Sequence, residues 1–127
     1  MKQSKPKGLR EKIVHLGVFD FSVVCVVGKY ENLGKYLRWK FEDNSLDLDD
    51  FYDGYKPRGK CCFCRGYVPV VWIPRLPQTP REHATLAHEC LHAVYHLFDW
   101  ASLPLTSDTE EVMTHSMGYL ISEFTKW

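Results

Sequence analysis

No stretch of this sequence is apolar for long enough to cross a membrane. The longest candidate, residues 18–27, is too short, and Asp20 interrupts it. The chain also lacks a charge excess, because its 16 Lys and Arg residues equal its 16 Asp and Glu residues. A nucleic-acid-binding protein is expected to carry an excess of basic residues. These absences argue against a membrane protein and against a nucleic-acid partner.

The cysteines do not form the even-numbered framework of a small secreted domain. There are five, and three of them cluster at Cys61, Cys62 and Cys64. The basic N-terminus leads into an apolar segment without a small-residue cleavage site, so no secretory signal is expected. We therefore expect a reducing, cytoplasmic location.

The 127 residues predict a single domain with its own hydrophobic core. Residues 13–28 are rich in β-branched side chains, which predicts one strand, or two strands broken near Gly17. A further strand is expected at residues 67–73. Pro69 lies within it and cannot donate a ladder hydrogen bond, so this strand is predicted to lie at a sheet edge.

Capping patterns predict where the two long helices begin. Thr79-Pro80-Arg81-Glu82 has the form of a capping box with proline at the first helical position, which predicts a helix over residues 80–100. Ser107-Asp108-Thr109-Glu110 has the same form and predicts a last helix that runs close to residue 127. A short helix is expected at residues 31–41. Residues 1–8 are expected to be a loose tail, and residues 42–58 a loop with at most one helical turn.

The strongest chemical signal is His88-Glu89-Cys90-Leu91-His92, which matches H-E-x-x-H. Residues four apart lie on one face of a helix, so both imidazoles can reach one tetrahedral zinc ion. Glu89 lies one step round the helix, where it can take a proton from a zinc-bound water without being a ligand. The pattern predicts a zinc site with Glu89 as the general base.

The composition of this helix favours a metal cleft over an ordinary surface helix. One face is apolar, and the other carries both motif histidines and Glu89. A solvated polar face usually holds Lys and Arg, yet neither occurs between Glu82 and Trp100. The apolar face comprises Leu86, Ala87, Cys90, Ala93, Val94, Leu97 and Phe98.

A third protein ligand is expected from the last helix. Glu111 shares a face with residues that are mostly small, and a small-residue face would let this helix approach the motif helix closely. Glu111 is therefore the predicted ligand. Glu110 points nearer the bulky face, and His115 remains open as an alternative ligand or as a hydrogen-bond donor to the transition state. Alternatively, Glu110 and Glu111 only interact favourably with the positive end of the helix dipole. The small face comprises Glu111, Thr114, His115, Gly118 and Ser122.

Residues 67–127 resemble a known group of peptidases. The run Thr85-Leu86-Ala87-His88-Glu89-Cys90-Leu91-His92-Ala93 is similar to the active-site helix of short zincin-like metallopeptidases encoded by tailed phages. The preceding strand and Pro-rich turn resemble that group too, as does Glu111 followed by Gly118. The gluzincin layout of the ImmA/IrrE peptidases is distantly similar, and His115 departs from it. The resemblance implies an α+β zincin-like fold with a small mixed sheet, and host cytoplasm as the location if the chain is phage-encoded.

The remaining cysteines and Trp72 are weaker candidates. Cys61, Cys62 and Cys64 could form a metal site with Cys25 or with a distant histidine, but loop cysteines without a role are the favoured interpretation. Trp72 could line a substrate cleft or belong to the core. Cys90 is interpreted as a buried core thiol. His15, His83 and His96 are interpreted as structural or solvent-facing. The alternative for His96 is that it donates a hydrogen bond that supports a metal ligand.

The function expected from these residues is hydrolysis of a peptide bond in a protein or peptide substrate, with Zn²⁺ as the cofactor. The alternative is a catalytically silent module that binds a host or regulatory protein. An open coordination position distinguishes them, because a structural zinc site is filled by a fourth protein ligand.

Overall fold

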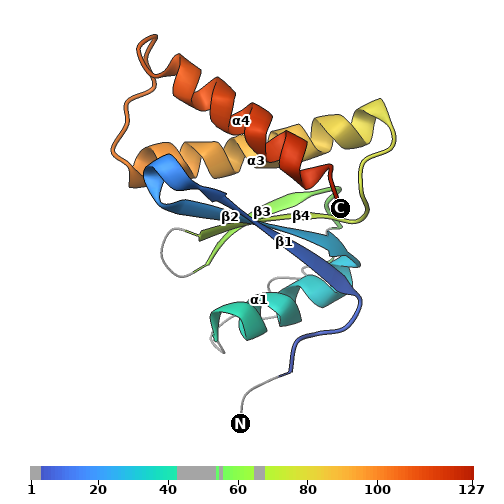
Figure 1. Ribbon diagram of the computed structural model, residues 1–127. Helices are drawn as coiled ribbons and strands as arrows, with labels where there is room; N and C mark the ends of the chain where they lie inside the picture. Colours follow the sequence, from blue (N-terminus) through green and yellow to red (C-terminus); the bar gives the residue numbers. More distant parts are fainter. Residues whose placement is uncertain (1–3, 43–53, 55, 65–67) are drawn as a thin grey trace.

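The computed structural model describes residues 4–42, 54, 56–64 and 68–127, excluding the side chain of Cys64 (Figure 1). It is an α+β fold with a small mixed sheet, as predicted, and the described part contains four strands and three α-helices. No helix in the described ranges is long and apolar enough to span a membrane. The elements are β1 (Leu9–Leu16), β2 (Phe21–Gly28), α1 (Leu33–Phe41), β3 (Lys60–Cys64), β4 (Val68–Ile73), α3 (Pro80–Trp100) and α4 (Glu110–Phe124), with 3-10 turns at Gly17–Phe19 and Tyr30–Asn32.

The strands lie in the order β1-β2-β4-β3. β1 and β2 form the antiparallel pair expected from the break near Gly17, while β2 and β4 run parallel. β3 pairs antiparallel with β4 and forms the sheet edge, so the prediction that the strand carrying Pro69 is an edge strand is wrong. The pairing explains why proline is tolerated there. β2 pairs with β4 only from Val70 onward, and Pro69 lies just before that segment, opposite Phe63 of β3.

Each face of the sheet is covered by helices, and each interface holds its own core (Figure 1). α1 packs on one face, against Val24, Val26 and Trp72. α3 and α4 pack on the other face, against a cluster that includes Val23 and Cys25. β2 is buried on both faces and is therefore apolar almost throughout, as expected for a central strand.

The two long helices begin in different ways. Thr79 and Glu82 form the predicted capping box before α3, with Pro80 as the first helical residue. The second predicted capping box is wrong. Thr109 is the residue before α4, and its side chain makes no hydrogen bond to the helix. Its hydroxyl group instead accepts a hydrogen bond from the Thr106 backbone N–H at 3.1 Å, which stabilises the preceding turn.

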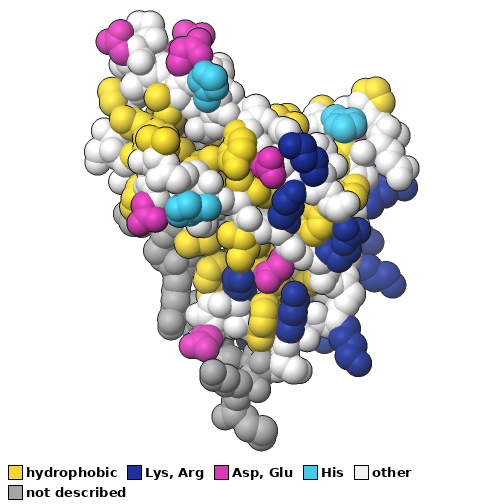
Figure 2. All heavy atoms as spheres, in the orientation of Figure 1, with side chains coloured by type: hydrophobic (Ala, Val, Ile, Leu, Met, Phe, Trp, Pro, Cys, Tyr) yellow, Lys and Arg dark blue, Asp and Glu magenta, His cyan; other side chains and the backbone are white. Residues whose placement is uncertain are grey.

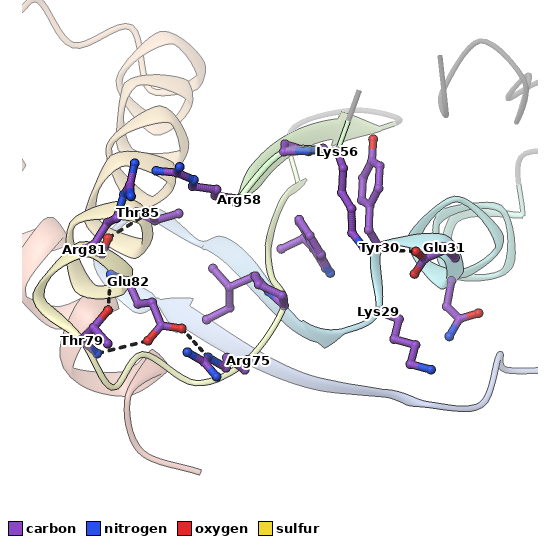
Figure 3. A pocket seen from close by; sticks show the side chains of 15 residues that line it. Lys29, Tyr30, Glu31, Lys56, Arg58, Arg75, Thr79, Arg81, Glu82 and Thr85 are labelled. Atoms are coloured by element: carbon purple, nitrogen blue, oxygen red, sulfur yellow. Dashed lines mark hydrogen bonds and ion pairs between the residues drawn. The ribbon is translucent and has the colours of Figure 1, made fainter. Parts of the chain in front are cut away.

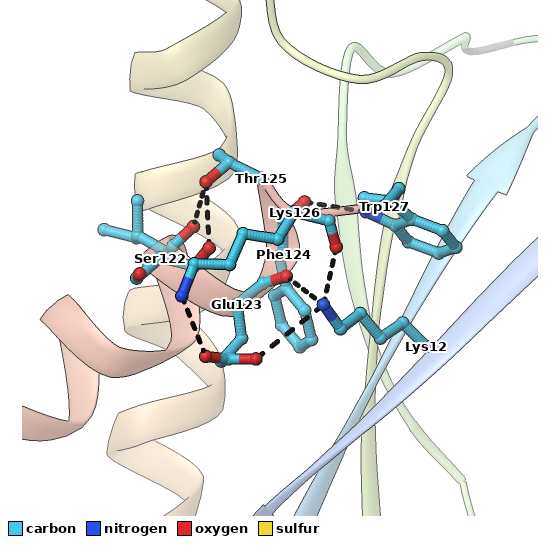
Figure 4. Close-up of polar contacts among 8 residues, drawn as sticks. Lys12, Ser122, Glu123, Phe124, Thr125, Lys126 and Trp127 are labelled. Atoms are coloured by element: carbon cyan, nitrogen blue, oxygen red, sulfur yellow. Dashed lines mark hydrogen bonds and ion pairs between the residues drawn. The ribbon is translucent and has the colours of Figure 1, made fainter.

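Lys12 of β1 holds the C-terminal end of α4 (Figure 4). Its ammonium group donates to the backbone carbonyls of Glu123, at 2.7 Å, and Lys126, at 2.5 Å. The carboxylate of Glu123 lies 3.7 Å from the same ammonium. These contacts place the end of α4 on the β1 side of the molecule, whereas β3 forms the opposite edge of the sheet.

The expected helix at residues 31–41 is confirmed as a 3-10 turn followed by α1. Of the expected loose tail, residues 4–8 precede β1 and belong to no strand or helix. The expected loop at residues 42–58 lies largely outside the described residues.

Candidate metal centre

The histidines of the H-E-x-x-H motif lie one turn apart near the middle of α3. Their Nε2 atoms are 3.2 Å apart, and their rings are nearly perpendicular with centroids 4.9 Å apart. Both side chains are exposed, with His88 at 67%. The two ring nitrogens therefore converge on one point outside the helix.

This spacing fits a shared zinc ion. Two nitrogen ligands at about 2.0–2.1 Å in a tetrahedral arrangement lie about 3.3–3.4 Å apart. The 3.2 Å between the Nε2 atoms of His88 and His92 is close to that distance. The pair consequently matches two corners of a tetrahedral site.

Glu89 points away from solvent, toward the edge strand. Its side chain is only 10% exposed, and one carboxylate oxygen lies 3.9 Å from Nε2 of His88. Burial raises the pKa of Glu89, while the neighbouring His88 and His92 and a hydrogen bond from the Cys61 backbone act in the opposite direction. The carboxylate is thus held beside the histidine pair in surroundings that increase its basicity.

Gly59 allows the chain before β3 to approach α3 closely. A Cβ atom at this position would lie 2.7 Å from Cγ2 of Thr85 and 3.1 Å from Cγ of Glu89. It would also lie 3.5 Å from the Trp72 carbonyl oxygen. Only a residue without a side chain fits between these groups, so Gly59 sets the distance between α3 and the edge strand.

Stacked rings join β3 to α3 one turn beyond the histidine pair. The rings of Phe63 and His96 lie 4.1 Å apart at 20°. β3 therefore runs beside the polar face of α3, with Cys61 next to Glu89 and Phe63 next to His96. Its outer edge is the sheet edge nearest the motif.

The structure does not bring Glu111 to the histidine pair. The predicted small-residue face of α4 is exposed, and the bulky face, which includes Leu120 and Phe124, packs against the core. A Cβ at Gly118 would meet nothing within 4 Å, so the predicted close approach through small residues is wrong. Burial determines which face of α4 turns inward, because burying its large apolar side chains against the sheet and α3 stabilises the fold more than burying small residues would.

Glu111 lies instead in the first turn of α4, with its side chain 84% exposed and 3.5 Å from His115. Both residues line a pocket with the β1–β2 connection. Figure 2 shows acidic side chains and a histidine gathered at the tip where α4 begins. Glu110 also begins α4 and is exposed. In the described part of the chain, no group of three or more His, Cys, Asp or Glu residues could hold a metal ion. The assignment of Glu111 as a ligand stays a prediction.

The cysteines predicted to lie in a loop belong to β3. Cys61 packs with the core under α3, whereas Cys62 is buried in the core under α1, so the two thiols lie on opposite faces of the sheet. Cys25 is fully buried beneath α3. Cys90 is also fully buried, as predicted, and desolvation raises its pKa to about 12. Trp72 belongs to the core, where its indole N–H donates to the Gly28 carbonyl at 2.9 Å.

A basic groove adjoins the motif and was not predicted from the sequence. Lys56, Arg58 and Arg81 line a cavity of about 650 Å³ together with His88 and Glu89. A larger cavity of about 1020 Å³ shares these three basic residues and extends toward the start of α1 (Figure 3). The spacing of Arg81, seven residues before His88 on the same helix, was the available signal. Nothing in the sequence indicated the contribution of residues 56–58, because they come from a different segment.

Comparisons of this chain with protein-family models, with curated proteins and with solved structures gave no match.

Proposed function

We propose that this protein is a zinc-dependent metallopeptidase that hydrolyses a peptide bond beside β3. The observation that carries the proposal is the 3.2 Å separation of the His88 and His92 Nε2 atoms, with the Glu89 carboxylate 3.9 Å from one of them. A pair of nitrogen ligands and an adjacent buried carboxylate are the parts that zinc-assisted hydrolysis requires.

A zinc ion held by the two histidines would supply Lewis-acid polarisation of the substrate carbonyl and would increase the acidity of a nearby water. Glu89 takes a proton from that water and then donates it to the leaving amine. Its position beneath His88, shielded from solvent, favours this role because burial raises its pKa. The outer edge of β3 offers backbone groups with which an extended peptide can pair as an added strand.

A second candidate is a partner-binding module in which the motif has no catalytic role. It is favoured by the exposed position of Glu111 beside His115, since no group of three or more His, Cys, Asp or Glu residues in the described part of the chain could hold a metal ion. The two candidates differ in what Glu89 does. A peptidase needs its carboxylate, whereas a binding module does not.

Glu89→Gln separates them. The proposal expects the variant to retain zinc, because Glu89 is not a ligand, and to lose cleavage of a mixed peptide pool followed by mass spectrometry. Glu110→Gln is the matched control, because it makes the same change at an exposed position in α4 and should leave cleavage intact. Equal cleavage by Glu89→Gln and wild type, or no cleavage by a zinc-loaded wild type, would reject the peptidase proposal.

A further inference from the structure

The groove beside the motif is strongly basic although the chain as a whole is neutral. Its titratable lining consists of Lys56, Arg58 and Arg81 with His88 and Glu89. Lys56, Arg58 and Arg81 thus face the carboxylate of Glu89, which is turned toward the backbone of Cys61, while Glu31 compensates part of the charge of Lys56. The local field of this groove favours an anionic ligand.

The arginines of the groove differ from their basic neighbours in their ion pairing. Arg75 pairs with Glu82 at the start of α3, and Lys56 lies 3.4 Å from Glu31. Within the described ranges, neither Arg58 nor Arg81 lies within 4.0 Å of a carboxylate. Figure 3 shows both side chains on the α3 side of the larger cavity. None of the described carboxylates pairs with these two guanidinium groups, and a planar guanidinium is suited to bidentate contact with a carboxylate.

The distance along the helix indicates where the anion would bind. Arg81 precedes His88 by seven residues, which corresponds to about 10 Å along a helix axis at 1.5 Å per residue. An extended peptide covers that distance in about three residues. Arg81, Thr85, His88 and His92 follow one stripe of α3, so the groove runs from the histidine pair toward the N-terminal end of the helix.

We propose that Arg58 and Arg81 select a peptide substrate that carries a carboxylate about three residues from the scissile bond. This inference rests on the proposed peptidase function. The carboxylate belongs either to an acidic side chain or to the C-terminus of the substrate, because both present the same planar group. A nucleic acid is disfavoured because the chain as a whole carries no excess of basic residues.

The test measures binding to the zinc-loaded Glu89→Gln protein, so that no substrate is consumed. Three nonapeptides of one alanine-and-serine sequence, each labelled with an uncharged BODIPY dye, serve as probes in fluorescence anisotropy. One is amidated and has a single internal aspartate, one is amidated and has asparagine in its place, and one has the asparagine and a free C-terminal carboxylate. We expect the aspartate peptide or the free-carboxylate peptide to bind about threefold to tenfold more tightly than the neutral peptide. This gain in affinity lies between that of an exposed ion pair and that of a bidentate contact.

Arg58→Gln and Arg81→Gln should each reduce that preference, and high salt should reduce it too. Lys7→Gln is the matched control, because it removes one positive charge from an exposed position outside the groove and should leave the preference unchanged. The peptide whose affinity exceeds that of the neutral peptide by the larger factor identifies the source of the carboxylate, an acidic side chain or the C-terminus. Equal binding of all three peptides, including no binding at the highest concentration, would overturn the proposal. Competition by oligothymidylate as strong as that of the acidic peptide would overturn it as well.

Failure of this inference is distinguishable from failure of the proposed function. A zinc-loaded wild type that cleaves peptides without any charge preference retains the function and loses only the role of the arginines. A protein without zinc or cleavage loses the function, while the same anisotropy measurement on the metal-free Glu89→Gln protein would still show whether a carboxylate preference depends on Arg81.

Discussion

Replacing Gly59 with alanine should weaken both the fold and the candidate site, because the new methyl group has no space. The closest contact, 2.7 Å to Cγ2 of Thr85, is far inside van der Waals separation. Thr85 cannot easily rotate away, since a β-branched side chain in a helix has few rotamers. Overpacking of this kind costs about 1–3 kcal/mol. The second contact, 3.1 Å to Cγ of Glu89, predicts that the carboxylate is displaced as well.

Thermal unfolding gives the stability change, and a loss of about 1–3 kcal/mol corresponds to a melting temperature about 4–12 °C lower. Gly59→Ala combined with Thr85→Ser removes the closest contact and should recover part of the loss. Gly118→Ala is the control, because its methyl group would meet nothing within 4 Å on an exposed helix face. That change should stabilise the protein by about 0.5–1 kcal/mol. A Gly59→Ala protein as stable as wild type would refute the close approach of α3 to the edge strand.

Three further predictions concern Lys12, the Arg75–Glu82 ion pair and Glu111. Lys12→Met should destabilise the protein by about 1–2 kcal/mol in urea unfolding, because two backbone carbonyls lose a charged donor that is partly exposed; an unchanged midpoint would show that the clamp of Figure 4 contributes nothing. Arg75 lowers the pKa of Glu82 from 4.5 to about 2, so the contribution of Glu82 to stability is present above pH 4.5 and is lost as the pH falls toward 2. In an NMR titration, Arg75→Gln should move the midpoint of Glu82 upward, and an unmoved midpoint would rule out this pairing. The sequence predicts that Glu111→Ala weakens zinc binding, whereas the exposed position of Glu111 beside His115 predicts unchanged zinc affinity; a tenfold or greater loss of affinity would establish Glu111 as a ligand.

Local signals in the sequence predicted the parts of the fold that local physics determines. The capping box and Pro80 predicted the first residue of α3 because they satisfy backbone donors within one turn. The spacing of His88 and His92 predicted their convergence because four residues make about one helical turn. The second capping pattern, in which Ser107 was the expected cap, failed because α4 begins only at Glu110, and Thr109 before it bonds to the preceding turn.

The parts that depend on packing between distant segments were not predictable in the same way. Pro69 indicated an edge strand, but β3 covers β4 on one side and the β2 pairing begins only after the proline. The phase of α4 was taken from small residues, whereas burial of the bulky face determined it. The basic groove combines Arg81 with Arg58 from another segment, and a single sequence contains no signal for that contact.

The measurement that tests the central claim most directly is the zinc content of the purified protein and of its His88→Ala and His92→Ala variants. The claim predicts about one zinc per wild-type chain, and loss of the metal from both variants, because each histidine provides one of the ligands that α3 contributes. His83→Ala is the matched control, because this exposed histidine lies in the first turn of the same helix and should not affect zinc. Full zinc content in both the His88→Ala and the His92→Ala variants, or a wild-type protein that binds no zinc, would contradict the account.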